Sequence, residues 1–298
     1  MKILLLGMNG QVGWELQRAL APLGELVSLD FDSPGPLAAD FTQPESLAAT
    51  VQTVAPQIIV NAAAHTAVDK AEGEPELART INATAPAVLA REAAAIGAWL
   101  LHYSTDYVFD GSGNAPRAED APTGPLSVYG STKLEGEQAI RASKCKHLIL
   151  RTSWVYAARG GNFARTMLRL AAEREQLNVI DDQHGAPTGA ELLADLSAHM
   201  LRTVQAQPSL GGTYHAVASG ETTWHGYAQH VIEFARRAGQ RVRAQPHDIR
   251  PVPTSAYPTA ARRPLNSRLD TRKLQQHFGL ALPDWRIGVD RMLREVLG

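Results

Sequence analysis

Short apolar runs alternate with helical patterns through the first half of the chain. The runs have the length of buried strands and lie at Lys2–Leu6, Glu25–Leu29, Gln57–Val60, Trp99–Tyr103 and His147–Leu150. Between them, apolar residues recur at helical spacing, as at Val12, Leu16 and Leu20. Strands that alternate with helices indicate βαβ units and a parallel sheet with helices on both faces. We therefore expect an α/β fold with a Rossmann-type, doubly wound parallel sheet.

The pattern changes after about residue 151, where glycine, proline and polar residues become more frequent. Residues 184–189 and 246–264 have the composition of loops, whereas 189–206 and 223–238 keep helical spacing. The sequence predicts a dinucleotide-binding domain over residues 1–152, to which these two later helices also contribute. Residues 153–298 then form a smaller, mainly substrate-binding domain.

Composition narrows the class of protein further. The 298 residues include 29 basic and 30 acidic side chains, so the formal net charge is −1. That balance argues against a general electrostatic binder of nucleic acid or membrane surfaces. Cys145 is the only cysteine, which excludes an intrachain disulfide and fits a reducing compartment. No apolar run reaches the roughly 18 residues of a membrane helix, and we expect a cytoplasmic enzyme.

A glycine-rich turn follows the first predicted strand. Gly7, Gly10 and Gly13 form a G-x-x-G-x-x-G pattern between an apolar run and a helical pattern. Glycines at such points permit a tight turn, close approach of a pyrophosphate and close packing of helix on strand. The free N–H groups of the following helix then face the phosphates. The turn predicts a dinucleotide site.

An acidic residue ends the second apolar run. Asp30 lies 17 residues after Gly13, where a carboxylate can accept hydrogen bonds from the adenosine ribose. Such a carboxylate would repel a 2′-phosphate, which favours NADH over NADPH. A surface-turn role for Asp30 and a competing role for nearby Asp32 both stay open.

Tyr129 and Lys133 are spaced to share one face of a helix. A tyrosine with a pKa near 10 transfers protons poorly at neutral pH unless a neighbouring cation stabilises the phenolate. Lys133, one turn away, is such a cation. A hydroxyl at Ser104 or Thr105, directly after the strand at 99–103, can hold a carbonyl oxygen beside Tyr129. Together these residues predict reduction of a carbonyl group.

Three further segments carry a resemblance to a known family. They are Asn-Ala-Ala-Ala-His-Thr-Ala-Val-Asp at 61–69, Ser-Thr-Asp-Tyr-Val-Phe-Asp-Gly at 104–111 and Arg-Pro-x-Asn-Ser-x-Leu at 263–269. With the glycine turn and the Tyr-x-x-x-Lys pair, they resemble the extended short-chain dehydrogenase/reductase family. The match is strongest with its reductases of dTDP-linked 4-keto sugars.

The resemblance implies a set of site residues. The implied catalytic residues are Thr105, in preference to Ser104, with Tyr129 and Lys133. The implied cofactor contacts, for NADH or NADPH, are Gly7, Gly10, Gln11, Val12, Gly13, Asp30, Asp40, Phe41, Ala63, His65 and Thr66, with Tyr129 and Lys133. The implied contacts to the dTDP-sugar are Thr105, Asp106, Trp154, Arg263, Asn266 and Ser267.

The resemblance also implies an assembly and a pathway. Some family members hold Mg²⁺ at a dimer interface with acids that match Glu15, Glu191 and Glu295, so a homodimer is expected. The sugar product would supply cell-surface polysaccharide such as lipopolysaccharide O-antigen. Two alternatives remain: another nucleotide-sugar reductase or epimerase of the family, and a non-catalytic regulatory subunit that binds NADP.

Overall fold

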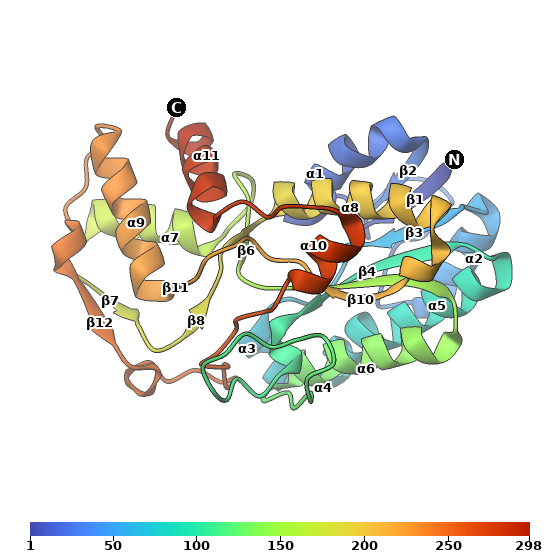
Figure 1. Cartoon of the computed structure of the whole chain (residues 1–298), viewed down its shortest axis with the longest axis horizontal. Coiled ribbons are helices and arrows are strands. Elements are labelled where there is room, and N and C mark those ends of the chain that lie inside the picture. Colours follow the sequence, from blue (N-terminus) through green and yellow to red (C-terminus); the bar gives the residue numbers. More distant parts are fainter.

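Six parallel strands form the central sheet of the computed structural model, which describes residues 1–298 (Figure 1). In spatial order the strands are β10 (Gly212–His215), β5 (Lys146–Thr152), β4 (Trp99–Thr105), β3 (Ile58–Asn61), β1 (Lys2–Leu6) and β2 (Glu25–Leu29). The chain order reverses between β1 and β3, so loops diverge there at the carboxyl ends of the strands and leave a crevice. The expected doubly wound parallel sheet is confirmed.

Alternation along the strands divides the core into two layers. Leu101 and Tyr103 of β4 pack with α1 (Gln11–Leu20), α8 (Ala190–Ala206) and α10 (Arg272–Phe278). Leu100 points to the other face, where the layer contains α2 (Pro44–Val54), α5 (Ala85–Ile96) and α6 (Val128–Ser143). Because side chains alternate with period two, His102 and Ser104 face the α6 layer.

Two short helices and a π-helical turn connect β3 to α5. These are α3 (Val68–Gly73), α4 (Pro75–Arg79) and the turn Thr80–Thr84. Pro86 lies in the first turn of α5, where its missing N–H costs no helical hydrogen bond. The sequence predicts a break near Pro86, and the irregular turn lies immediately before it.

A second apolar cluster lies at the left of Figure 1 and contains α7 (Phe163–Glu173), α9 (Trp224–Arg237) and α11 (Trp285–Leu297). The parallel pair β7 (Leu177–Ile180) and β12 (Ile249–Val252) covers it. Smaller pairs join β6 (Val155–Tyr156) to β9 (Thr188–Gly189), and β8 (His184–Gly185) to β11 (Thr222–Thr223). Of the two later helices expected with the first domain, α8 packs there, whereas α9 lies in this second cluster because its buried residues meet α7 and α11.

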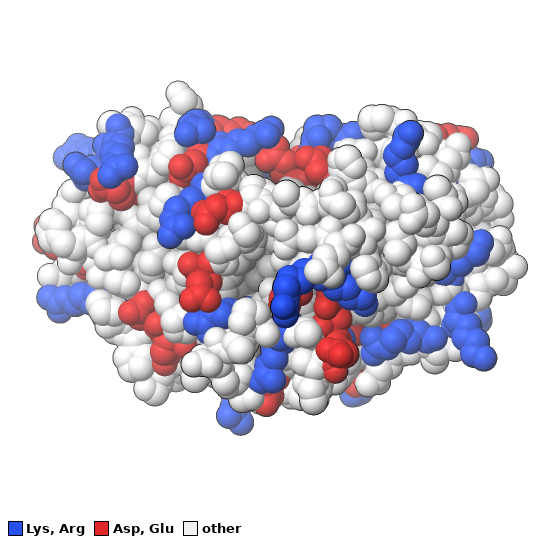
Figure 2. All heavy atoms as spheres, viewed as in Figure 1, with Lys and Arg blue, Asp and Glu red and all other residues white.

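The surface mixes charges of both signs. Figure 2 shows basic and acidic side chains interspersed over the visible face, with a hollow between the two halves of the molecule. No helix is long and apolar enough to cross a membrane.

Candidate active site

A cavity of about 720 Å³ lies at the carboxyl ends of the central strands. Residues from both halves of the chain line it, from Gly7 after β1 to Trp224 at the start of α9. Lys133 is the one lysine or arginine among the lining residues. The cavity therefore offers backbone N–H groups and aromatic rings rather than a general positive field.

The glycine turn forms one end of this cavity. Gly7 has φ +86°, and a Cβ there would lie 2.7 Å from the Ala63 nitrogen. A Cβ on Gly13 would lie 1.9 Å from the Gly7 oxygen, so only glycine permits this approach of helix to strand. Gly10, Gln11 and the next residue, Val12, line the cavity at the first turn of α1. The turn fits a dinucleotide pyrophosphate.

The acids after β2 and the nearby phenylalanines differ in where they point. Asp30 lines the cavity, and its carboxylate accepts hydrogen bonds from the Asn9 nitrogen at 2.8 Å and the Phe31 nitrogen at 2.9 Å. Asp40 also lines the cavity but accepts bonds from the backbone and side chain of Thr42. Phe31 and Phe41 both line the cavity, but Phe41 is only 5% exposed and packs in the core, whereas Phe31 is 73% exposed. Phe31 is thus the freer apolar surface for an adenine, and the sequence reasoning missed it.

The loop after β3 contributes small groups. Ala63 and Thr66 line the cavity, but His65 does not. The His65 backbone is bonded on both sides to the Asn82 side chain, at 2.9 and 3.1 Å. Asn82, in the π-helical turn, also donates to Thr132 and so fixes this loop against α6. The sequence did not predict this role of Asn82, because no local sequence pattern indicates it.

The three implied catalytic residues meet in the cavity. Tyr129 is the second residue of α6, which Ser127 caps by accepting from the Gly130 nitrogen. Burial raises the pKa of Tyr129 to about 12, although the nearby Thr105 hydroxyl opposes that rise. Burial lowers the pKa of Lys133 to about 8. These shifts mark a site adapted to proton transfer.

Asp106 follows Thr105 and is 2% exposed. Burial raises the pKa of its carboxyl group to about 6, although a hydrogen bond from the Thr105 hydroxyl, at 3.1 Å, opposes the rise. Its Oδ2 and the Oγ1 of Thr152 are buried atoms without a partner, and both residues line the cavity. Unpaired buried polar atoms of this kind suit ligand hydroxyl groups.

An aromatic wall faces these polar atoms. Trp154 has φ +49°, an uncommon conformation for a residue other than glycine. Its ring stacks on Trp224 with centroids 3.7 Å apart and planes 16° apart, and both rings line the cavity. Gln183 accepts a hydrogen bond from the Trp224 indole at 3.0 Å and fixes its orientation. Sequence reasoning identified Trp154 but missed Trp224.

The residues at 263–267 do not line the cavity. Arg263 forms a bidentate pair with Asp69 of α3, at 3.1 and 2.7 Å, and is not free for a diphosphate in this structure. Asn266 donates to the Ala115 carbonyl at 2.9 Å and holds the loop after β4. Ser267 is buried, and its backbone N–H donates to the His184 carbonyl at 2.8 Å.

A buried ion pair stiffens the helix that carries the catalytic pair. Glu137 of α6 accepts from Arg151 at 2.8 and 2.7 Å and from Ser104 at 2.6 Å. These bonds hold the pKa of Glu137 below its usual value although burial opposes them. They connect α6 to β4 and β5 at the level of the site.

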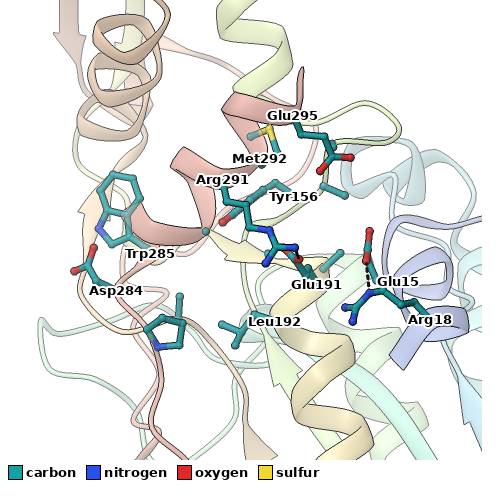
Figure 3. A pocket seen from close by; sticks show the side chains of 17 residues that line it. Glu15, Arg18, Tyr156, Glu191, Leu192, Asp284, Trp285, Arg291, Met292 and Glu295 are labelled. Atoms are coloured by element: carbon teal, nitrogen blue, oxygen red, sulfur yellow. Dashed lines mark ion pairs between the residues drawn. The ribbon is translucent and has the colours of Figure 1, made fainter. Parts of the chain in front are cut away.

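The three implied metal ligands line a different cavity, of about 210 Å³ (Figure 3). Glu191 pairs with Arg291 at 2.6 Å, and Glu15 pairs with Arg18 at 3.5 Å. Glu295 also lines the cavity, but no three acidic, histidine or cysteine groups of the chain are arranged to hold a metal ion. Two of the three carboxylates already have arginine partners, so the residues of one chain do not fit Mg²⁺.

Comparison with known proteins gives this geometry a family. The RmlD substrate binding domain family matches residues 1–297. The chain is 60% identical over 296 residues to dTDP-4-dehydrorhamnose reductase of Escherichia coli K12, covering 99% of this chain and 98% of that protein. It is similar to the crystal structure of a dTDP-4-dehydrorhamnose reductase from Clostridium acetobutylicum, with TM-score 0.89, 33% identity and full coverage of both chains. It is also similar to the crystal structure of dTDP-4-dehydrorhamnose reductase from Bacillus anthracis in complex with NADP, with TM-score 0.86, 34% identity and 99% coverage of both chains. The chain belongs to the RmlD substrate binding domain family.

Proposed function

We propose that this protein reduces the C4 ketone of dTDP-4-dehydro-β-L-rhamnose to give dTDP-β-L-rhamnose, the last step of dTDP-L-rhamnose biosynthesis. The observation that carries the proposal is the meeting of Thr105, Tyr129 and Lys133 in a cavity that begins at the glycine turn. The name shared by the relatives at up to 60% identity supports this reaction.

Each group has a defined task in the proposed reaction. When bound, the reduced nicotinamide supplies the hydride that adds to sugar C4. Tyr129 donates its phenolic proton to the C4 oxygen as that oxygen gains charge, a contribution of about 10²–10⁴-fold for a general acid. Thr105, whose hydroxyl lines the same cavity as Tyr129, orients the same oxygen. Lys133, when charged, stabilises the phenolate that remains.

The substrate end of the cavity suits a sugar nucleotide. Unpaired Asp106 Oδ2 and Thr152 Oγ1 offer partners to sugar hydroxyls. The stacked Trp154 and Trp224 offer a flat apolar wall for a ring. The pairing of Arg263 with Asp69 leaves the diphosphate to other donors in this conformation.

The cofactor is NADH or NADPH, and we propose a preference for NADH. Asp30 lines the cavity, and Lys133, at the catalytic end, is the sole basic side chain among the lining residues. A 2′-phosphate would therefore meet a carboxylate without a compensating arginine. The relative from B. anthracis was solved in complex with NADP, so the ratio of kcat/KM for the two cofactors is the measurement that decides.

The wider setting is part of the same proposal. We propose a cytoplasmic homodimer whose product supplies polysaccharide such as lipopolysaccharide O-antigen. Sedimentation of the purified protein tests the dimer. No step of the reaction is assigned to Mg²⁺, because Glu15 and Glu191 already pair with arginines.

Tyr129→Phe tests the reaction. The variant is expected to lose about 10²–10⁴-fold in kcat with the synthetic 4-keto sugar nucleotide and NADH, since the proton donor is gone. Tyr214→Phe is the matched control, because it removes another buried tyrosine hydroxyl, outside the cavity. Wild-type turnover in Tyr129→Phe would refute the assignment. Stoichiometric consumption of NADH separates a reductase from an epimerase or a silent regulatory subunit.

A further inference from the structure

Lys133 lies at the end of a buried chain of hydrogen bonds that starts on the central sheet. Asn61 ends β3, and His102 is its register partner on β4. Asn61 Nδ2 lies 3.0 Å from His102 Nδ1, and His102 Nε2 lies 3.2 Å from Lys133 Nζ. Lys133 Nζ also donates to the Tyr103 carbonyl at 2.6 Å. Asn61, His102 and Lys133 are each at most 2% exposed, so water does not compete for these bonds.

The orientation of Asn61 determines which nitrogen of His102 carries a proton. The Ala63 N–H donates to Asn61 Oδ1 at 3.1 Å, which turns the NH₂ group of Asn61 towards His102. His102 Nδ1 must then accept. Burial lowers the pKa of His102 well below its usual value, so the ring is neutral and has one donor. That donor is Nε2–H, which faces Lys133.

A charged lysine does not fit opposite this donor. An ammonium group has three N–H donors and no acceptor, so it would present N–H to N–H across 3.2 Å. A neutral amine can accept from His102 Nε2–H and still donate to the Tyr103 carbonyl. Every partner in the chain is therefore satisfied when Lys133 is neutral.

The surroundings of Lys133 agree with this assignment. Burial lowers its pKa to about 8, and Glu137 on the same helix opposes that shift. Glu137 itself is neutralised by Arg151 and Arg141. The other titratable groups that line the cavity on this side are Tyr129 on α6 and Asp106, directly after β4, whereas the Tyr103 phenol lies on the opposite face of the sheet. Burial raises the pKa of Tyr129 to about 12, and Asp106 adds to that rise.

We propose that His102, oriented by Asn61, is a positioning residue that favours the neutral amine of Lys133 over its ammonium until the reduced dinucleotide binds. Binding offers ribose hydroxyls as acceptors, so Lys133 leaves His102, and the molecules in which it is neutral take up a proton from solvent to form the ammonium. In this charged form Lys133 stabilises the Tyr129 phenolate. The idea rests on the proposed function, but it predicts properties of the free protein that do not depend on turnover.

The tautomer of His102 is the first test. Long-range ¹H–¹⁵N spectra of the cofactor-free protein above pH 8, where the amine is mostly neutral, distinguish Nε2–H from Nδ1–H imidazole, and His102→Gln identifies the signals. The expected result is a neutral ring with its proton on Nε2. A proton on Nδ1, or a charged ring near neutral pH, would overturn the proposal, whether or not the protein reduces a sugar.

Proton uptake on NADH binding is the second test. Calorimetry at pH 8 in two buffers of different ionisation enthalpy is expected to show uptake of roughly half a proton per site, because the pKa of Lys133 is about 8. At pH 6 the uptake is expected to vanish, since the amine is already charged there. Uptake near zero at both pH values would refute the proposal.

Asn61→Asp reverses the direction of the hydrogen bonds from residue 61 through His102 to Lys133, and the side chain keeps nearly the same shape. A carboxylate still accepts from the Ala63 N–H and now accepts from His102 Nδ1–H, so Nε2 becomes an acceptor for a charged Lys133. Uptake at pH 8 should disappear. Ser197→Ala is the matched control, because it removes a buried hydrogen bond to β4 from the opposite face of the sheet, at Tyr103 Oη, and should keep the uptake. Unchanged uptake in Asn61→Asp would overturn the role of the Asn61–His102 pair. Should that variant not fold, the wild-type tautomer and uptake still decide.

Discussion

The two ends of the cavity are built in different ways. The phosphate turn consists of residues 7–13, and its shape comes from backbone and missing side chains. The opposite end brings together Asp106, Trp154 and Trp224, which come from three separate segments. A site made by local backbone leaves a pattern in the sequence, whereas a site made by distant side chains leaves isolated residues.

Gly13→Ala probes the backbone-built end and should have the largest effect. The new Cβ would lie 1.9 Å from the Gly7 oxygen, so the turn must open. We expect the free energy of NADH binding to become about 3 kcal/mol or more less favourable, which is roughly a hundredfold lower affinity. Fluorescence titration with NADH measures this change. Gly73→Ala is the control, because nothing lies within 4 Å of its added Cβ. Normal NADH affinity in Gly13→Ala would show that the turn is not built by close approach.

Asp106 probes the side-chain-built end through pH. Its folded pKa of about 6 lies above the ordinary 3.8, so the native state binds the proton more tightly than the unfolded state. The free energy of unfolding should therefore fall as pH rises from about 4 to 6, by an amount on the order of 2–3 kcal/mol. Asp106→Asn should lose this dependence in urea titrations at several pH values. A wild type and variant with parallel pH profiles would contradict the assignment.

Trp224→Leu tests whether the aromatic wall acts as a pair. Loss of the stacking partner should free Trp154, and aromatic pairs contribute about 0.5–1.5 kcal/mol, so KM for the sugar nucleotide should rise up to about tenfold. The affinity for NADH should not change, because the turn is at the other end. Tyr257→Leu, at an exposed aromatic outside the cavity, should leave both values as they are. A change in NADH affinity instead would mean that the two ends are not independent.

The pair Asp69–Arg263 should give the smallest effect. If the pair only connects the two halves of the molecule, Asp69→Asn and Arg263→Gln should each lower the free energy of unfolding by about 0.2–1 kcal/mol. The double variant should lose less than the sum of the two single changes. KM for the sugar nucleotide should change less than twofold in both. A large rise in KM for Arg263→Gln alone would show that Arg263 leaves Asp69 to bind the diphosphate.

The fold was largely predictable where strands are long and buried. The five apolar runs of the first half correspond to β1 to β5, because a parallel sheet covered on both faces requires continuous apolar segments. The sixth strand, β10, was not predicted, because Gly212–His215 is short and mostly polar. Its place comes from pairing with β5, which no local pattern encodes.

The site follows the same division. Gly7, Tyr129 and Lys133 could be predicted from their spacing together with their position after the predicted strands, because turn and helix geometry set their distances. Phe41, expected at the adenine, lines the cavity but is mostly buried, and Phe31 beside it is exposed, a difference that depends on how residues 31–43 pack. Trp224 lies 70 residues beyond Trp154 along the chain, and only the tertiary structure brings the two rings together.

The late position of β10 and α8 in the chain has a consequence for synthesis. The edge of β5 and the apolar face of α1 are complete only when residues 190–215 have left the ribosome. At about 5–20 residues per second, the roughly 60 residues between β5 and β10 take about 3–12 s to be made. During that time the nascent nucleotide-binding half carries an open strand edge and an uncovered helix, which makes it a client for chaperones that shield such surfaces.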